Sequence, residues 1–512
     1  MDFESIGIQT NFSIVDWVII VVYLLVIVGI GVYIKRYITN ATDFIVAGRS
    51  LKTFLAVATM IGTELGLITV MYNAQKGFTG GFAAFHIAVM AVVATLMVAF
   101  TGYIVVPLRR MRVMTIPEFY EKRFGRGVRI LGGIILAFSG ILNMGMFLKA
   151  GSLFVSGVTG LTSETELKLI MTVLLGMVLL YTTLGGMVSI VVLDYIQFVV
   201  LSFSLMIACI ISINYLGWNN IIDTVRELKG EAGFNPFHGE GFGWSYVVWM
   251  FFLGIVSCAV WQTSVIRACA AEDVRTVKKI YLWSAIGFMM RALIPFFFGI
   301  CALVFVYQNA DLRAEFLPEG AVADPQKTLS AMPIFFSQVL PVGFIGLISA
   351  GMLAAFMSTH DSYLLCWSSV LTQDVVTPWF KDGLPSKTRL LLTRFFIVCI
   401  GIFILIWGLW YNLGQDLWDY MAISGAIYFT GAISVLTFGL YWKPASKVGA
   451  YLSLICGFVA LVGLKPVQNL FGMEDISSAI VGLSVIALSA VVMVLGSLVF
   501  PDRHPVSDFK EQ

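Results

Sequence analysis

The sequence predicts an all-α polytopic membrane protein with thirteen transmembrane helices. Of its 512 residues, 59% are hydrophobic and only 12% are charged, and long apolar runs recur along the whole chain. A soluble domain carries roughly 25% charged residues, whereas a membrane-spanning helix needs about 20 consecutive apolar ones. The runs are continuous and much longer than the alternating ~10-residue strands of an outer-membrane barrel. We therefore expect a single transmembrane domain over residues 1–512.

The apolar runs set the limits of the predicted spans. These limits are approximately 14–34, 53–75, 80–106, 127–158, 168–186, 188–216, 243–268, 280–307, 342–371, 390–411, 417–441, 447–464 and 477–499. A further apolar stretch, 331–340, is bracketed by Pro333 and Pro341, and we expect it to form a short interfacial helix.

The distribution of Lys and Arg predicts the orientation in the membrane. With the N-terminus outside, 23 of the 32 basic residues fall on the cytoplasmic side, Arg267 among them, and seven fall outside. Cytoplasmic loops are enriched in Lys and Arg, so we expect an external N-terminus and a cytoplasmic C-terminus in a plasma membrane, of the bacterial inner-membrane type. The net charge of +2 and the lack of a basic block exclude a nucleic-acid partner. The sequence contains no GxxxxGK[ST] motif, which excludes ATP-driven transport.

Glu64 lies in the middle of the second predicted span, between Gly62 and Gly66. An ionisable group there costs about 2.5–3.5 kcal/mol on insertion scales, and glycine disfavours a helix interior. The pattern favours a helix that unwinds within the membrane and frees carbonyls to line a cavity or hold an ion. A kink satisfied by a neighbouring helix is the alternative. A second polar stretch, 257–264, follows five spans later, and such paired interruptions point to an inverted-repeat transporter.

Ser358, Asp361 and Ser362 share one face of the ninth predicted span. Hydroxyl and carboxylate oxygens are ligands that alkali cations prefer. Hydrogen bonding between helices is the alternative for the hydroxyls. The carboxylate one turn from Ser358 favours a cation site.

Other polar residues within the spans have two interpretations each. Arg291 either reaches the interface or places a positive charge near a bound solute. His86 is either a packed residue or a ligand of the substrate, and Asp194 either reaches lipid headgroups or belongs to a site. For Lys149 a salt bridge to a neighbouring helix is the default expectation.

Four segments, in order and at compatible spacing, resemble motifs of the sodium:solute symporter family. They are Asp43–Leu51, Thr115–Phe124, Tyr181–Met187 followed by Asp194–Gln197, and Ser358–Ser362. The resemblance covers nearly the whole chain and implies a leucine-transporter-like five-plus-five inverted repeat. Its core would occupy about 53–216 and 243–441, with peripheral helices at about 14–34, 447–464 and 477–499.

The resemblance also implies ligands, position by position. The main Na⁺ site would comprise Gly62, Leu65, Ala355, Ser358 and Thr359. A second cation site would comprise Asp194, Asp361 and Ser362 together with Ser358. Asp361 stands where some members of the family have a serine. Substrate contacts would come from Thr63, Glu64, Trp261, Gln262 and Arg291.

The function that these observations predict is Na⁺-coupled uptake of a small organic solute, of the amino-acid, carboxylate or sugar type, by alternating access. Na⁺ is the expected coupling ion, and a monomer in the lipid bilayer suffices for this mechanism. The first alternative is H⁺ coupling on the same scaffold through Glu64 or Asp361. A remote alternative is an intramembrane enzyme that uses His360 and Asp361, but adjacent helical residues point about 100° apart. We therefore expect a transporter and not an enzyme.

Overall fold

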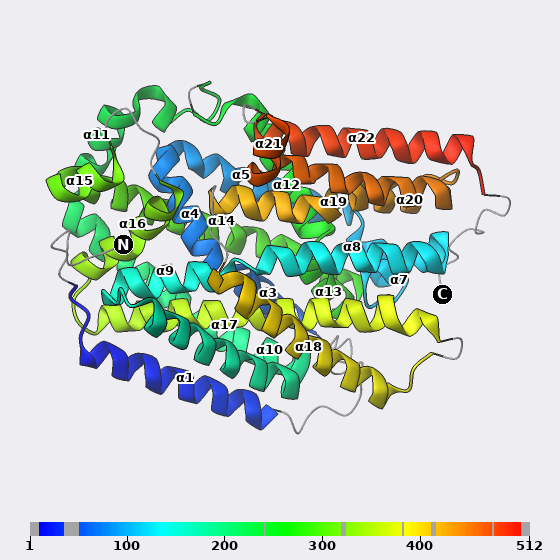
Figure 1. The fold of residues 1–512 in the computed structure, drawn as a ribbon, viewed down its shortest axis with the longest axis horizontal. Helices are drawn as coiled ribbons and strands as arrows, with labels where there is room; N and C mark the ends of the chain where they lie inside the picture. Colours follow the sequence, from blue (N-terminus) through cyan, green and yellow to red (C-terminus); the bar gives the residue numbers. More distant parts are fainter. Residues whose placement is uncertain are drawn as a thin grey trace.

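The computed structural model describes residues 10–34, 51–239, 241–318, 324–380, 383–410, 416–473 and 476–502. Within these ranges the chain is helical, and the strand-type pairing consists of one isolated bridge between Leu51 and Ala271. The first family-like motif, Asp43–Leu51, lies outside the described residues except for Leu51. Figure 1 shows the long helices running side by side along the longest axis, with α1 at one edge and α22 at the opposite edge.

The N-terminal half contains the first broken helix and the longest helix. Its helices are α1 (Ile14–Ile34), α3 (Thr53–Glu64), α4 (Leu67–Gly80), η3 (Gly81–Ala84), α5 (Phe85–Thr101), α6 (Val105–Arg110), α7 (Ile116–Phe124), α8 (Arg126–Met144), α9 (Phe147–Thr159), α10 (Glu164–Leu216), α11 (Trp218–Lys229) and η4 (Gly230–Gly233).

The C-terminal half contains the second broken helix and the peripheral helices. Its helices are α12 (Gly243–Ala259), α13 (Gln262–Ala270), α14 (Val274–Gln308), α15 (Ala310–Phe316), α16 (Pro325–Val339), α17 (Phe344–Val370), η5 (Leu371–Val376), η6 (Thr377–Trp379), α18 (Ser386–Trp410), α19 (Leu417–Tyr441), α20 (Lys447–Cys456), η7 (Gly457–Gly463), α21 (Lys465–Phe471) and α22 (Ser478–Val499).

Each predicted span coincides largely with helix. Among the described residues, nine helices are long and apolar enough to cross a membrane, or ten if the bent pair α12 and α13 is taken as one span. The remaining candidates are shorter, such as Thr53–Glu64, or are merged into continuous helical stretches, such as Leu67–Thr101. The number thirteen therefore stays a prediction.

The helix α10 shows how two predicted spans merge into one continuous element. At 1.5 Å per residue its 53 residues would extend roughly 80 Å, far beyond a bilayer core of about 30 Å. Gly186 has a left-handed backbone (φ 49°, ψ −147°) that interrupts the helix. Both ends of α10 lie near the end of α14 and the following helix α15, because Tyr215 contacts Phe305 of α14 and Glu164 shares a cavity with Glu315 of α15. The chain therefore doubles back at Gly186, at the predicted boundary between the two spans.

Two helices are broken at the middle of the molecule, as the sequence predicts. The helix α3 ends at Glu64 and α4 begins at Leu67, so Leu65 and Gly66 form the first break. The helix α12 ends at Ala259 and α13 begins at Gln262, with a bend of 41° between them. The breaks face each other, because Glu64 at the end of α3 bonds to residues at the start of α13.

The apolar stretch 331–340, expected to be a short interfacial helix, forms part of a longer, buried helix in the structure. The helix α16 begins at Pro325, includes Pro333 in its interior, and is buried over nearly all of Thr328–Val339. It packs against α4, α9 and α14 rather than lying at a surface. Pro333 packs closely against Gly157 of α9, where an added Cβ would collide with it.

Candidate functional site

The carbonyl groups left free by the break in the first helix have specific partners. Glu64 is the last residue of α3, and its carbonyl accepts hydrogen bonds from the Thr69 hydroxyl (2.9 Å) and from Arg291 Nη1 (2.7 Å). Helix ends leave such carbonyls unpaired unless side chains reach them. The break is therefore held from α4 on one side and from α14 on the other.

The hydroxyls of α17 reach the carbonyls just before the break. Ser358 donates to the carbonyls of Gly62 (3.3 Å) and Ala355 (3.2 Å). Thr359 donates to the carbonyls of Thr63 (3.2 Å) and Ala355 (3.0 Å). These contacts bring four of the five residues predicted for the main Na⁺ site together and add the carbonyl of Thr63. We call this group, Gly62, Thr63, Ala355, Ser358 and Thr359, the α3–α17 oxygen cluster.

The fifth residue predicted for that site, Leu65, lies within the break itself. No hydrogen bond among the described residues joins Leu65 to Ser358 or Thr359. Its neighbour Gly66 is in contact with Thr359, so closely that an added Cβ would overlap the Thr359 hydroxyl. Leu65 is thus near the oxygen cluster without being bonded to it.

Asp194 and Asp361, both fully buried, occupy the second predicted cation site. Asp194 Oδ2 accepts hydrogen bonds from the hydroxyls of Thr59 (2.6 Å) and Thr63 (2.9 Å), and Thr63 in turn bonds to Ser362 at 2.9 Å. Asp361 Oδ2 accepts a hydrogen bond from the Tyr181 hydroxyl at 2.9 Å. The Thr63 side chain, predicted to contact substrate, therefore belongs to this carboxylate cluster instead.

Arg267 supplies a positive charge at the same place. Its Nη2 lies 3.6 Å from Asp194 Oδ2, donates to Ser362 Oγ at 2.9 Å, and also donates to Thr63 Oγ1. The side chain is only 2% exposed. The sequence counts Arg267 among the basic residues of the cytoplasmic side, whereas in the structure its guanidinium turns inward and pairs with buried acceptors. Such a pairing is what allows an arginine to be buried.

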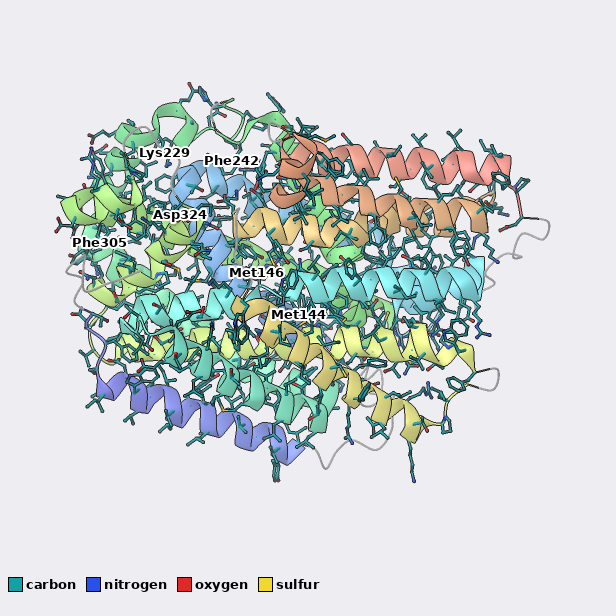
Figure 2. All side chains as sticks on the ribbon, viewed as in Figure 1. Met144, Met146, Lys229, Phe242, Phe305 and Asp324 are labelled. Carbon is teal, nitrogen blue, oxygen red and sulfur yellow. The ribbon has the colours of Figure 1, made fainter. Side chains whose placement is uncertain are left out.

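A cavity of about 140 Å³ lies between the two broken helices. Its lining comprises Glu64, Tyr72, Ile87, Ala91, Asn143, Met250, Leu253, Gly254, Ser257, Trp261, Arg291, Tyr363, Trp418, Met421, Ala422, Gly425 and Phe429. Two larger cavities, of about 610 and 540 Å³, are lined in part by residues of the segments that connect the long helices. Lys229 and Phe242 from the first of these appear near the edge of the molecule in Figure 2, whereas Met144 and Met146 appear near its centre. We take the smaller cavity as the candidate solute site because residues beside both helix breaks line it.

Glu64 and Arg291 form an ion pair within this cavity. Arg291 Nη1 lies 3.1 Å from Glu64 Oε2, and each side chain is 15% exposed. The other carboxylate oxygen, Oε1, accepts hydrogen bonds from Thr263 and Ser264 of α13, each at 3.2 Å. Glu64 thereby links α3, α13 and α14, which is a structural reason for a carboxylate at the middle of the membrane.

The structure separates the other residues predicted to contact substrate. Trp261 lines the cavity and donates from Nε1 to the Tyr363 hydroxyl at 3.2 Å. Gln262 points toward the segment before α7, where its Oε1 accepts a hydrogen bond from the backbone N–H of Ile116 at 2.9 Å. His86 bonds to the carbonyl of Ala83 and packs against Phe242 and Tyr246, outside the cavity lining. The structure therefore keeps Glu64, Trp261 and Arg291 at the cavity but not Gln262, Thr63 or His86.

Two further expectations concern residues outside these clusters. Lys149 makes no ion pair among the described residues; it lines the 540 Å³ cavity together with Lys168 and Glu164. His360 bonds to the Phe356 carbonyl and packs on Phe147 and Phe356, whereas Asp361 faces Tyr181 of α10. The two side chains therefore point to different elements and do not form a shared reactive site.

Several residues of the candidate site do not follow from the sequence alone. Thr59 and Tyr181 both bond to the buried carboxylates, although Tyr181 lies within a family-like motif. Asn143 is a polar residue within a predicted span, which is the signal that could have identified it. Its Nδ2 donates to the Met421 carbonyl (2.8 Å) and to Ser424 (2.9 Å) of α19.

Comparisons with known proteins identify related transporters that align over most of the chain. A family model described as "Sodium:solute symporter family" matches residues 44–457. The chain is 24% identical to the sodium/sialic acid symporter NanT of Aliivibrio fischeri, over 90% of this chain and 89% of that protein. It is also 24% identical to sodium/proline symporter 2 of Staphylococcus saprophyticus, over 92% of this chain and 91% of that protein.

Solved structures show the same fold. The structure of a Na⁺-coupled sialic acid symporter in a substrate-bound outward-open state matches with a TM-score of 0.80 and 18% identity, covering 96% of this chain and all of that one. MhsT in complex with L-phenylalanine matches with a TM-score of 0.53 and 13% identity, covering 88% and 98% of the two chains. These likenesses confirm the leucine-transporter-like fold. The chain belongs to the sodium:solute symporter family, and it is a Na⁺-coupled transporter of a small solute rather than an enzyme.

Proposed function

We propose that a Na⁺ ion binds at the α3–α17 oxygen cluster and couples its own movement to that of a solute in the 140 Å³ cavity. The observation that carries this proposal is the pair of hydroxyls, Ser358 and Thr359, that meet main-chain carbonyls beside the break. A hydroxyl hydrogen can rotate away, which leaves its oxygen as an acceptor. Hydroxyl and carbonyl oxygens then offer the all-oxygen surroundings that hard cations prefer. The Leu65 carbonyl within the break completes the proposed ligand set.

The location of this cluster accounts for coupling. The ion would join α3, which ends in the solute cavity, to α17, which contributes Tyr363 to the same cavity. A ligand shifts a conformational equilibrium only by its differential affinity for the two states. Na⁺ bound between these helices would favour the arrangement in which the cavity accepts solute. Each Na⁺ entering across 100 mV releases about 2.3 kcal/mol, which drives alternating access.

The second predicted cation site takes a different role in this proposal. Arg267 already donates to the hydroxyl of Ser362, which is one of the ligands predicted for a second Na⁺, and to the hydroxyl of Thr63, which is bonded to Asp194. We therefore assign the positive charge at this place to Arg267 and expect one Na⁺ per solute. Asp194 and Asp361 would hold the guanidinium and Tyr181 in position rather than bind a second ion.

The orientation and the location extend this proposal. Figure 1 places α7 and the C-terminal end of α22 at one end of the molecule and α11 and α15 at the other. The basic residues Lys122 and Arg123 lie on α7, which supports a cytoplasmic position for that end. The N-terminus would then be outside, in a plasma membrane such as the bacterial inner membrane. A single domain over 1–512, with its inverted repeat at about 53–216 and 243–441, would act as a monomer.

Solute flux into proteoliposomes that contain the purified full chain tests the proposal. With a membrane potential held constant, we expect uptake in an inward Na⁺ gradient and none in an equal K⁺ gradient. Equal uptake in both would contradict Na⁺ coupling at this site. Uptake driven by an inward pH gradient in Na⁺-free buffer would favour the H⁺-coupled alternative, through Glu64 or Asp361.

A further inference from the structure

The charged groups of the solute cavity leave a defined set of hydrogen-bonding positions for a ligand. Two of the three hydrogen bonds to the Glu64 carboxylate end on Oε1 and one ends on Oε2. A carboxylate has about four acceptor positions, so one position on Oε2 stays open. Arg291 uses both hydrogens of Nη1 on Glu64. Among the described residues, no acceptor meets its Nε or Nη2.

These open positions match the two charged groups of an α-amino acid. The three remaining N–H groups of Arg291 form a fork of the kind that binds a carboxylate with two parallel hydrogen bonds. The open acceptor of Glu64 belongs to the same ion pair, because its Oε2 lies 3.1 Å from Arg291 Nη1. A solute that carries both a carboxylate and an ammonium group would use both sets of open positions. A carboxylate without an ammonium would instead face Glu64 with a like charge.

Most of the other side chains that line the cavity are apolar or aromatic. Ile87, Met250, Leu253, Met421 and Phe429 line it, together with the rings of Tyr72, Trp261, Tyr363 and Trp418. The polar side-chain groups of this lining apart from the ion pair are the Asn143 amide, the hydroxyls of Ser257, Tyr72 and Tyr363, and the indole N–H groups of Trp261 and Trp418. A sugar carries hydroxyls on all sides, and each one left without a partner costs about 1–3 kcal/mol. The lining therefore favours a solute with one polar end and an apolar body.

The net charge of the cavity points to the same class. Glu64 and Arg291 are the charged residues of the lining, and they compensate each other. A solute with a net charge would leave one uncompensated charge deep in the membrane, which is unfavourable. We propose that the transported solute is a zwitterion of zero net charge with an apolar side chain, an amino acid of the leucine or phenylalanine type. This inference rests on the proposed function, because it takes the 140 Å³ cavity as the solute site.

Equilibrium binding to the purified full chain tests the solute class directly. The probes are L-leucine and L-phenylalanine as zwitterions, N-acetyl-L-leucine as an anion, L-leucine methyl ester as a cation, and D-glucose as a neutral polyol. In saturating Na⁺ we expect L-leucine or L-phenylalanine to quench tryptophan fluorescence and to raise the unfolding temperature. The singly charged analogues and glucose should bind at least tenfold more weakly. Binding of N-acetyl-L-leucine or glucose as tight as that of the zwitterions, or no binding of either zwitterion, would overturn the inference.

The same titrations in K⁺ separate this inference from the proposed function. Zwitterion binding of equal strength in Na⁺ and K⁺ would contradict sodium coupling while supporting the solute class. Na⁺-dependent binding of the anion or the sugar alone would support sodium coupling and overturn the solute class. Different experimental results would therefore contradict the sodium coupling and the solute class.

Two variants test the two ends of the cavity. Arg291→Lys keeps the charge but removes the fork, and we expect it to weaken L-leucine binding at least tenfold. Ala422→Leu enlarges a side chain of the apolar lining, and we expect it to weaken L-phenylalanine more than L-alanine. Because Ala422 takes no part in the ion pair, this second variant tests the apolar half even if Arg291→Lys fails to fold. Equal weakening of the two amino acids would contradict the assignment of their side chains to this part of the cavity.

Discussion

The Thr359 hydroxyl lies directly against the main chain of Gly66, at the break between α3 and α4. An added Cβ at Gly66 would overlap both the hydroxyl and the Cβ of Thr359. Glycine at position 66 therefore allows two helices to approach closely. Its φ of −82° is one that any residue can adopt, so the backbone conformation alone does not require glycine. The absence of a side chain lets the oxygen of Thr359 reach the carbonyls before the break.

From this contact we predict that Gly66→Ala raises the Na⁺ concentration for half-maximal transport at least tenfold. The added methyl group would displace Thr359 from the oxygen cluster, and a tenfold change corresponds to about 1.4 kcal/mol. The measurement is initial uptake as a function of Na⁺ in proteoliposomes. Gly176→Ala in α10 is the control, since its Cβ would meet open space and should leave the Na⁺ dependence unchanged. An unchanged Na⁺ dependence in Gly66→Ala would place the ion elsewhere.

The hydroxyls of Ser358 and Thr359 should determine Na⁺ affinity. We predict that Ser358→Ala and Thr359→Val each raise the apparent Na⁺ requirement at least tenfold, because each removes one oxygen from the cluster. Thr359→Ser keeps the oxygen and should preserve most of the affinity. Ser349→Ala, on the same helix, provides a matched control because the Ser349 hydroxyl has no hydrogen-bond partner among the residues that the structure describes. If all four variants share one Na⁺ dependence, these hydroxyls are not ligands.

Arg267 and Asp194 should stabilise the fold as a pair. We predict that Arg267→Gln lowers the free energy of unfolding by about 3–5 kcal/mol, the usual cost of leaving a buried charge without its partner. The second change Asp194→Asn should recover part of this loss, because it removes the charge left behind. Thermal unfolding of the four purified proteins measures this double-mutant cycle. Losses that simply add in the double variant would show that the two side chains are not coupled.

The proposed ratio of one Na⁺ per solute gives a further test of the role of Arg267 and Asp194. The reversal potential of uptake at two Na⁺ gradients should correspond to one Na⁺ per solute in the wild-type protein. Arg267 donates to the hydroxyls of Thr63 and Ser362 and so occupies the place beside Asp194 where a second ion would bind. A measured ratio of two Na⁺ per solute would contradict the role given to Arg267.

The sequence predicts the first break because glycine and a carboxylate within an apolar run are energetically costly unless they have a structural or functional role. Gly62, Glu64 and Gly66 carry this signal, and the structure places the break at Leu65 and Gly66. The sequence also predicts that Ser358 and Asp361 share a face of the helix, because helical spacing determines which residues lie on the same side. These features depend on local chemistry, which a single sequence contains.

Which helix each face of a neighbouring helix contacts depends on tertiary packing, and the local sequence does not determine it. Arg267 counts as one more cytoplasmic cation in the sequence, and only the approach of α3 and α10 to α13 explains its burial. Thr63 and Glu64 are adjacent, yet one side chain turns to Asp194 and the other to Arg291. Residue spacing along α3 could not decide between these partners.

Trp261 and Gln262 are neighbours in sequence at the second break but serve different parts of the protein. Trp261 lines the solute cavity, whereas Gln262 accepts a hydrogen bond from Ile116 N–H at the start of α7 and donates to the Met114 carbonyl at 3.4 Å. We predict that Gln262→Leu lowers the maximal transport rate and the unfolding temperature but changes the solute affinity less than twofold. The reason is that it detaches α13 from the segment before α7 without touching the cavity.

Trp261→Leu should give the opposite result. It removes a ring from the cavity lining and a hydrogen bond to Tyr363, so we expect solute affinity to fall at least tenfold. Equilibrium binding gives the affinity of both variants, and proteoliposome flux gives their maximal rates. A large loss of affinity in Gln262→Leu would restore Gln262 to the solute site that the sequence predicts for it. Variants of Trp261 and Gln262 thus distinguish an effect on solute binding from an effect on the transport rate, although the two residues are adjacent at one helix break.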